Sequence, residues 1–227
     1  MAGVGEGLDA RIRYPSYKSL DAHVDVERLR RLDGYIRPRL EARLALDRDQ
    51  RFYTGPFLLD GKDPTNPGTR MVRLSCSTRP DDYFDLDNPD IWRLTHEAAE
   101  FSELMAFIAT LPFSKTARMM IIYDDEARPV SPHRDHESAE ICHEFIWFQT
   151  TVSKPFYMLR PETGEKQYVR SHTAWFDSVN QFHGSDAQGG LTFSIRVDGV
   201  FDDKFRGHIP RCDGNPAATP ALWAALD

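Results

Sequence analysis

The sequence has few cysteines and no long hydrophobic run. Its three cysteines, Cys76, Cys142 and Cys212, have no paired spacing, which argues against a disulfide-built secreted domain and indicates reduced thiols. No apolar stretch approaches the length needed to cross a bilayer, and the segment MAGVGEGLDARIRYP lacks the apolar core of a signal peptide. We therefore expect a cytoplasmic protein with no membrane partner.

An excess of basic charge is also missing. The formal net charge of the 227 residues is −7, which argues against a general nucleic-acid partner. Hydrophobic residues make up 41% of the chain and charged residues 28%, as in a globular protein that buries a core. We predict a single domain over 1–227, in which the Gly-rich and then polar stretch 1–22 forms a loose arm.

Helical periodicity is confined to the first half of the chain. Over residues 25–46 the apolar residues recur three or four apart, which predicts one buried helical face. Gly34 and Pro38 indicate two helical pieces there rather than one. A second helix is predicted over 97–110, with Thr95 as its N-terminal cap.

Short β-compatible segments fill the second half, separated by turn-forming stretches such as RPETGEK and SDAQGG. The predicted strands are 117–123, 145–152, 155–159, 167–169, 174–176 and 191–201. Strands with no helices between them favour an antiparallel sandwich or barrel. We predict an α+β fold, a double-stranded β-helix (jelly roll) with N-terminal helices packed on one sheet and a core over 115–202.

The stretch SPHRDH holds the first candidate metal ligands. On an extended strand, side chains two apart point to the same face, so His133 and Asp135 project together and His136 faces the other way. His183, in WFDSVNQFHGSD, follows an apolar segment and can return to a neighbouring strand. Two histidines and one carboxylate form the facial arrangement of non-haem Fe(II) oxygenases, although zinc accepts the same ligands.

Arg196 favours Fe(II) over zinc, because it suggests an anionic cosubstrate. It lies in the apolar segment LTFSIRVDG, where burying an arginine is costly without an anionic partner. Its planar guanidinium suits a carboxylate held through two hydrogen bonds. The cosubstrate 2-oxoglutarate has the required shape, because it chelates a metal through one end and carries a second carboxylate at the other.

The pattern His133-Arg134-Asp135, then His183, then Arg196 resembles the HxD…H…R signature of Fe(II)/2-oxoglutarate-dependent dioxygenases. Within that superfamily, the segments ARMMIIYDDEARPVSPHRDH, TTVSKPFYML and WFDSVNQFHGSD are similar to the aspartyl/asparaginyl β-hydroxylase and cis-proline hydroxylase type. The similarity covers about residues 115–202. One departure is that the strand HEFIWFQ lacks the arginine which that type uses for the cosubstrate; Arg118 is a candidate replacement.

The resemblance implies a function and a site. His133, Asp135 and His183 would be the catalytic metal ligands for Fe(II), Arg196 would bind the cosubstrate 2-oxoglutarate, and ascorbate would be a stimulating reductant. With O2 as the oxidant, we expect hydroxylation of an unactivated C–H bond in a small polar substrate such as a free amino acid.

Two other functions remain open at this point. A cupin-like metalloenzyme, an isomerase or hydrolase, would use the same ligands without 2-oxoglutarate, and Arg196 would then bind the substrate. A non-catalytic small-molecule binding module is the other possible function.

Aromatic side chains are also expected at the site. In each of the pairs Trp147-Phe148 and Trp175-Phe176, strand alternation predicts that one member lines the site.

Overall fold

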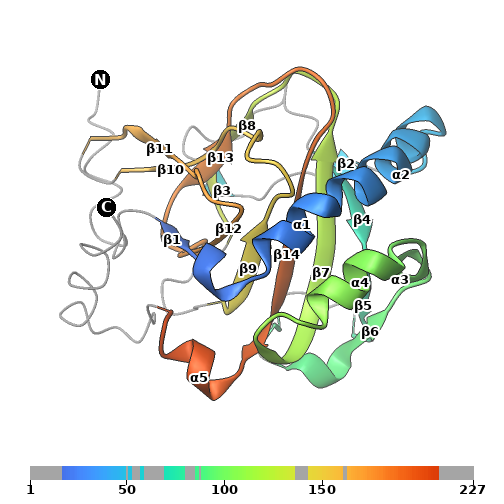
Figure 1. Cartoon of the computed structure of the whole chain (residues 1–227). Coiled ribbons are helices and arrows are strands. Elements are labelled where there is room, and N and C mark those ends of the chain that lie inside the picture. Colours follow the sequence, from blue (N-terminus) through green and yellow to red (C-terminus); the bar gives the residue numbers. More distant parts are fainter. Residues whose placement is uncertain are drawn as a thin grey trace.

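The computed structural model describes residues 17–49, 51–52, 57–58, 69–79, 85–86, 88–135, 143–160 and 163–209. Two antiparallel sheets form its centre (Figure 1). The seven-stranded sheet has the order β1 (Tyr17–Ser19), β12 (Thr173–Phe176), β9 (Phe145–Phe148), β14 (Thr192–Phe201), β7 (Phe113–Asp124), β4 (Thr69–Arg73) and β2 (Arg51–Phe52). The five-stranded sheet has the order β11 (Lys166–Tyr168), β10 (Phe156–Leu159), β13 (His183–Ser185), β8 (Val130–Arg134) and β3 (Phe57–Leu58). Two further strands, β5 (Ser75–Ser77) and β6 (Trp92–Leu94), pair separately.

From β7 to β14 the chain passes back and forth between the two larger sheets. Strands β7, β9, β12 and β14 belong to the seven-stranded sheet, while β8, β10, β11 and β13 belong to the five-stranded one. This path is that of a double-stranded β-helix, so the predicted α+β jelly roll is confirmed. Each of the six predicted strands is present, with boundaries shifted by a few residues.

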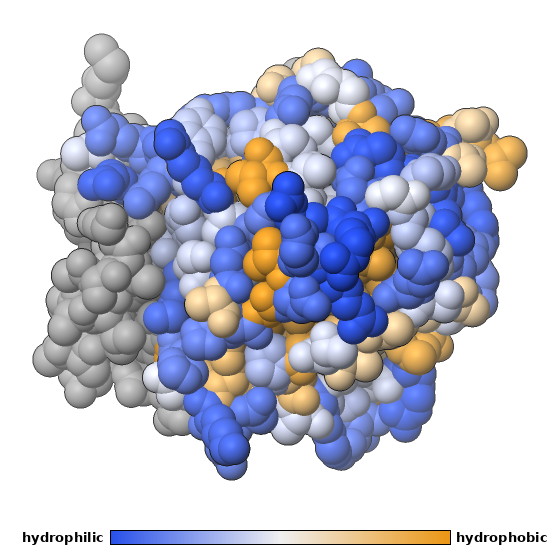
Figure 2. All heavy atoms as spheres, in the orientation of Figure 1, coloured by the Kyte–Doolittle hydropathy of each residue, from blue (hydrophilic) through white to orange (hydrophobic). Residues whose placement is uncertain are grey.

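Helices cover the outer face of the seven-stranded sheet (Figure 1). The helices on this face are α1 (Val26–Arg31), α2 (Asp33–Ala45), α3 (Glu97–Glu100) and α4 (Ser102–Ile108). Helix α5 (Asp203–Arg206) lies beyond the end of the sheet, after β14, and the two 3-10 helices are η1 (Asp21–His23) and η3 (Pro89–Ile91). Leu29, Ile36 and Phe107 from the helices pack in one buried cluster with Ile121 and Ile195 from the sheet. Figure 2 shows that this helical side is mostly hydrophilic at its surface. None of the helices in the described ranges is long and apolar enough to span a bilayer.

Both helical regions are present as predicted, and the first is in two pieces as expected, but other details differ. The break in the first helix is at Leu32, and Pro38 lies inside α2, where its ring removes only one backbone hydrogen bond. The second helix is also in two pieces, α3 and α4, which meet at Phe101. Thr95 does not cap it with its side chain, because its hydroxyl donates to the Arg73 carbonyl at 2.6 Å.

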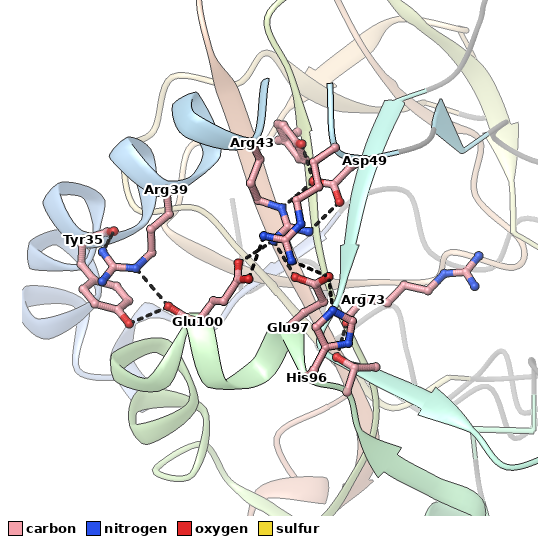
Figure 3. A network of polar contacts seen from close by, with 11 residues as sticks. Tyr35, Arg39, Arg43, Asp49, Arg73, His96, Glu97 and Glu100 are labelled. Atoms are coloured by element: carbon pink, nitrogen blue, oxygen red, sulfur yellow. Dashed lines mark hydrogen bonds and ion pairs between the residues drawn. The ribbon is translucent and has the colours of Figure 1, made fainter. Parts of the chain in front are cut away.

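A buried ion cluster joins the helices to the sheet (Figure 3). The Arg43 guanidinium of α2 donates to Asp49 at 2.6 Å, to Glu97 at 2.5 Å and to Glu100 at 2.6 Å. The hydroxyl of Tyr123 in β7 donates to the same Asp49 carboxylate at 2.6 Å. One arginine therefore ties α2, α3 and β7 together.

The predicted N-terminal arm is shorter than 1–22. Residues 1–16 lie outside the described part of the chain, as do His136, Cys142 and Cys212. Tyr17–Ser19, however, pairs with β12 as an edge strand. The Asp21 carboxylate accepts hydrogen bonds from the backbone and the hydroxyl of Thr173, each at 2.7 Å. These contacts fix the chain from Tyr17 onward.

Candidate metal centre

Two neighbouring strands of the five-stranded sheet bring the two predicted histidines together. His133 on β8 and His183 on β13 are direct cross-strand partners, with ring centroids 4.4 Å apart. Gly184 permits this approach, because a Cβ there would lie 2.5 Å from the Val130 carbonyl oxygen. Asp135 follows β8 directly, and its backbone N–H donates to the Ser178 carbonyl at 2.8 Å. The three residues predicted as ligands therefore meet at one place.

The donor atoms converge as a metal site requires. Oδ1 of Asp135 lies 3.3 Å from His183 Nε2 and 3.9 Å from His133 Nε2. One ligand atom from each of the three residues lies within 4.8 Å of the other two. Both histidines are almost completely buried, with 7% and 3% of their surface exposed. Two imidazoles and one carboxylate facing a common point fit a divalent transition metal.

Backbone contacts set which nitrogen of each ring faces that point. His133 Nδ1 lies 2.9 Å from the Ser131 carbonyl, and His183 Nδ1 lies 3.0 Å from the Gln181 carbonyl. Because a carbonyl oxygen only accepts, Nδ1 must carry the proton in both rings. The Nε2 lone pairs are then free to bind a metal, and metal-binding histidines are commonly oriented in this way.

The protonation states also suit a metal. Burial, with a smaller contribution from His183, lowers the pKa of His133 to about 4. Burial alone would raise the pKa of Asp135, but the Arg196 guanidinium and the two histidines hold it well below its usual range. Near neutral pH, His133 is therefore neutral and Asp135 ionised, which are the forms that coordinate metals.

Arg196 lies beside this centre, on the inner face of β14. It is 7% exposed, and its side chain donates to Asp135 Oδ2 through NH1 and to Asp198 Oδ1 through Nε at 2.9 Å. The Asp135 carboxylate is thus divided, with Oδ1 toward the histidines and Oδ2 toward Arg196. The NH2 group has a longer contact, 3.5 Å to the Ser178 hydroxyl. The predicted role of Arg196 with 2-oxoglutarate stays a prediction.

Two further buried polar residues of this region, Asp198 and His143, were not singled out in the sequence. Asp198 is fully buried and accepts from both Arg196 and Arg118, whose Nε lies 3.0 Å from Asp198 Oδ2. His143 is buried, and its Nε2 has no hydrogen-bond partner among the residues that the structure describes. Burial, and then the charge of Arg196, lower the pKa of His143 to about 4. The only sequence signal for Asp198 was its two-residue spacing from Arg196, which places both on one face.

Aromatic side chains line the centre from both sheets. The Phe176 ring lies 5.1 Å from that of His183, and the Phe156 ring lies 5.8 Å from it. Trp147 stacks on Phe156 at 4.8 Å, whereas its neighbour Phe148 faces the helices and meets Phe107. The prediction that the two members of each aromatic pair face opposite ways is confirmed for Trp147 and Phe148. These rings limit the access of water to the site.

A second acidic group, Asp124, Asp125 and Glu126, has a different character. Arg51 contacts Asp124 at 3.3 Å and Glu126 more closely. These contacts account for two of its three carboxylates without a metal.

Comparison with known proteins gives only remote likenesses. No protein-family model and no curated protein sequence matches the chain. A prolyl-4-hydroxylase from Pseudomonas putida is similar in structure, with 11% identity and a TM-score of 0.46 over 82% of this chain and 93% of that one. The epimerase SnoN, in a complex with Fe3+, alpha ketoglutarate and nogalamycin RO, has 12% identity and a TM-score of 0.45 over 85% and 82%. AviO1 from Streptomyces viridochromogenes Tue57 has 15% identity and a TM-score of 0.45 over 89% and 97%. Likenesses this low assign neither a family nor an activity.

Proposed function

We propose that the chain is an Fe(II)- and 2-oxoglutarate-dependent oxygenase of the dioxygenase superfamily that its HxD…H…R pattern resembles. One observation carries the proposal: His133 Nε2, His183 Nε2 and Asp135 Oδ1 converge, with both Nδ1 atoms fixed by backbone carbonyls. Two histidines and one carboxylate on one side of a metal leave positions for a chelating cosubstrate and O2. When Fe(II), 2-oxoglutarate and O2 are bound, such a centre supplies the oxidation of an unactivated C–H bond.

In this proposal each residue of the chain has a defined task. His133, His183 and Asp135 hold the metal, and the carbonyls of Ser131 and Gln181 keep the two rings in the correct tautomer. Arg196 keeps Asp135 ionised and turned toward the histidines. We further propose that Arg196 contributes its NH2 group to a carboxylate of 2-oxoglutarate, because its other donors already have partners.

We also propose that the substrate is small and polar, such as a free amino acid, and that it is hydroxylated. The centre lies between two sheets, and its ligands are largely buried. Phe156 and Phe176 place apolar rings beside His183. A small substrate with a few polar groups suits such an enclosed site.

The test begins with metal-free protein. Under anaerobic conditions, Fe(II) and 2-oxoglutarate should produce a weak visible charge-transfer band in the wild type. His133→Ala and His183→Ala should each abolish the band and iron-dependent turnover, because each removes one of three ligands. His96→Ala is the matched control, since His96 is 80% exposed and pairs with Glu97 away from the site. Ascorbate should stimulate turnover.

A tightly bound zinc without the band would instead support the cupin-like isomerase or hydrolase. Once the band is established, free amino acids can be screened for stimulation of succinate release, followed by mass spectrometry for a product 16 Da heavier. Failure of every amino acid to stimulate release would remove that substrate class while leaving the metal assignment intact.

A further inference from the structure

The turn that joins β12 to β13 is buried along its whole length, residues 177–182. Its four polar side chains, those of Asp177, Ser178, Asn180 and Gln181, are each 2% exposed or less. Connections between strands usually run over the surface, because a buried connection must find partners for its polar groups inside the protein. The hydrogen bonds of this turn therefore show what it supports.

Asp177 holds the turn closed at two positions. Its Oδ1 accepts the backbone N–H of Asn180 at 3.1 Å, and its Oδ2 accepts the side-chain amide of Asn180 at 2.8 Å. The backbone N–H of Asp177 donates to Gln181 Oε1 at 3.1 Å, and its carbonyl accepts the N–H of Gln181 at 2.8 Å. Side chain and main chain of one residue thus fix the path of the chain as far as Gln181.

Three contacts run from this turn to the metal centre. The Ser178 carbonyl accepts the backbone N–H of Asp135 at 2.8 Å. The Gln181 carbonyl lies 3.0 Å from His183 Nδ1. The Ser178 hydroxyl lies 3.5 Å from the NH2 group of Arg196. A displacement of the turn would therefore move Asp135 and rotate His183 at the same time.

We propose that Asp177 is a positioning residue for the metal centre. It is not one of the three converging ligands, and it acts through the turn, whose carbonyls it keeps directed at Asp135 and His183. Contacts that orient metal ligands commonly change metal affinity when they are lost. The inference rests on the proposed metal centre and adds to it a residue outside the ligand set.

Metal binding by two variants tests the role of Asp177. Asp177→Ala should weaken Zn(II) binding by roughly 10- to 100-fold, measured by competition with a chromophoric chelator. It should also change the visible absorption of bound Co(II), which depends on the arrangement of the ligands. Asp177→Asn should fall between, because it keeps an acceptor for the N–H of Asn180 but offers an amide to the Asn180 amide. If Asp177→Ala does not fold, Asp177→Asn decides.

Arg43→Met is the matched control, because Arg43 ties the helices to the sheet through Asp49 and Glu97, away from this turn. It should lose stability and keep both the Zn(II) affinity and the Co(II) spectrum of the wild type. Unchanged Zn(II) affinity and an unchanged Co(II) spectrum in the folded Asp177 variants would reduce Asp177 to a structural residue. Equal weakening of Zn(II) binding in Arg43→Met would also overturn the proposal, since any loss of stability would then have the same effect.

A second measurement does not need the metal. In metal-free wild-type protein near neutral pH, long-range ¹H–¹⁵N NMR spectra should show His183 with its proton on Nδ1, as the Gln181 carbonyl requires. Asp177→Ala and Asp177→Asn should shift His183 toward the other tautomer. His133 is the internal control, because its Nδ1 faces the Ser131 carbonyl outside the turn.

The NMR result separates this proposal from the proposed function. A wild-type protein that binds no metal would remove the oxygenase, whereas a shifted His183 tautomer in the Asp177 variants would still support the positioning role. An unchanged tautomer of His183 in both folded variants would overturn that role, whatever the metal affinity.

Discussion

Asp135 has two partners, and this division makes Arg196 part of the metal centre. One carboxylate oxygen faces the two histidines, while the other is held by Arg196. Arg196 is in turn fixed by the fully buried Asp198. Groups that orient a metal ligand in this way commonly affect affinity nearly as much as the ligands do.

We therefore expect Arg196→Met to weaken metal binding by roughly 10- to 100-fold. Asp135 would lose the cation that keeps its pKa low and its Oδ1 in position. Arg196→Lys should fall between, because it keeps the charge but loses the planar guanidinium. Competition for Zn(II) against a chromophoric chelator measures the effect. Arg206→Met is the control, because Arg206 contacts Glu144, Asp203 and the Phe201 carbonyl rather than Asp135.

The same variant tests the cosubstrate role of Arg196. At saturating metal, the dissociation constant of 2-oxoglutarate should also rise if the NH2 group binds its carboxylate. An unchanged value, with metal affinity reduced, would restrict Arg196 to positioning Asp135. Unchanged metal affinity would show that the contact with Asp135 does not matter for the site.

At the residue scale, the sequence indicates ligands better than it indicates their surroundings. The two-residue spacing of His133 and Asp135 predicts a common direction, because strand alternation is a local property. The sequence does not show which carboxylate pairs with Arg196, because tertiary packing decides which anion a buried arginine contacts.

Among the elements, the spacing of β8 and β13 decides whether the two histidines meet. Gly184 lies where these strands approach, and a side chain there would also come within 3.0 Å of the Tyr157 hydroxyl. Gly184→Ala should therefore push the strands apart, lowering the free energy of unfolding by about 1–3 kcal/mol and weakening metal binding. Gly189→Ala is the control, because no atom lies within 4 Å of a Cβ at that position.

Thermal unfolding and Zn(II) competition on both glycine variants give the answer. If Gly184→Ala bound metal as tightly as the wild type, the site would tolerate separation of its two strands, and the contact at Val130 would be irrelevant to it.

The helices depend on a different set of contacts, centred on Arg43 (Figure 3). Arg43→Met should lower the free energy of unfolding by about 3–5 kcal/mol, because it leaves the buried Asp49 without its ion-pair partner and removes the nearest cation of Glu97. Burial alone would raise the pKa values of both acids, but Arg43 holds them low. Their stabilising contribution is present above about pH 4 and is lost as the pH falls below it.

Urea unfolding between pH 3 and 7 checks this expectation, with Arg30→Met as the control because the Arg30–Glu27 pair is largely exposed. Equal stabilities of the two variants would mean that the cluster around Arg43 contributes nothing. Metal affinity of folded Arg43→Met should equal that of the wild type, since the helices cover the sheet face opposite the metal centre.

The elements themselves were largely predictable, and their ends were not. Apolar periodicity identified the two helical regions, and apolar runs between turns identified six strands. Short strands such as β13 and β5 have too few residues to show a pattern, so their pairing is set by the rest of the sheet. Thr95 is a further example of a tertiary contact that the local sequence does not show. Its residue type favours a helix N-cap, but its hydroxyl donates to the Arg73 carbonyl instead.

At the scale of the whole molecule, stability and function make opposite demands on the space between the sheets. The outer face of the seven-stranded sheet is packed with helices and apolar side chains, whereas its inner face carries Arg118, Ser194, Arg196 and Asp198. Buried charges reduce stability unless each has a partner. Lys154, a part-buried residue just before β10, forms no ion pair within the described residues and donates to the Ser194 hydroxyl, so its substitution measures what this charge costs the fold.

We expect Lys154→Met to stabilise the protein at pH 7. The folded protein lowers the pKa of Lys154 from 10.5 to about 8, and a difference of that size corresponds to about 3 kcal/mol at most. Because part of the side chain reaches solvent, a gain of about 1–2 kcal/mol is the expected result. The gain should be complete below pH 8, where both folded and unfolded chains carry the charge. It should shrink as the pH rises from 8 toward 10.5, since the folded protein then releases its proton before the unfolded chain does. Denaturant unfolding at pH 7 and pH 10, with Lys166→Met as control, measures both parts. A loss of stability at pH 7 would show instead that Lys154 supports the fold through its contact with Ser194.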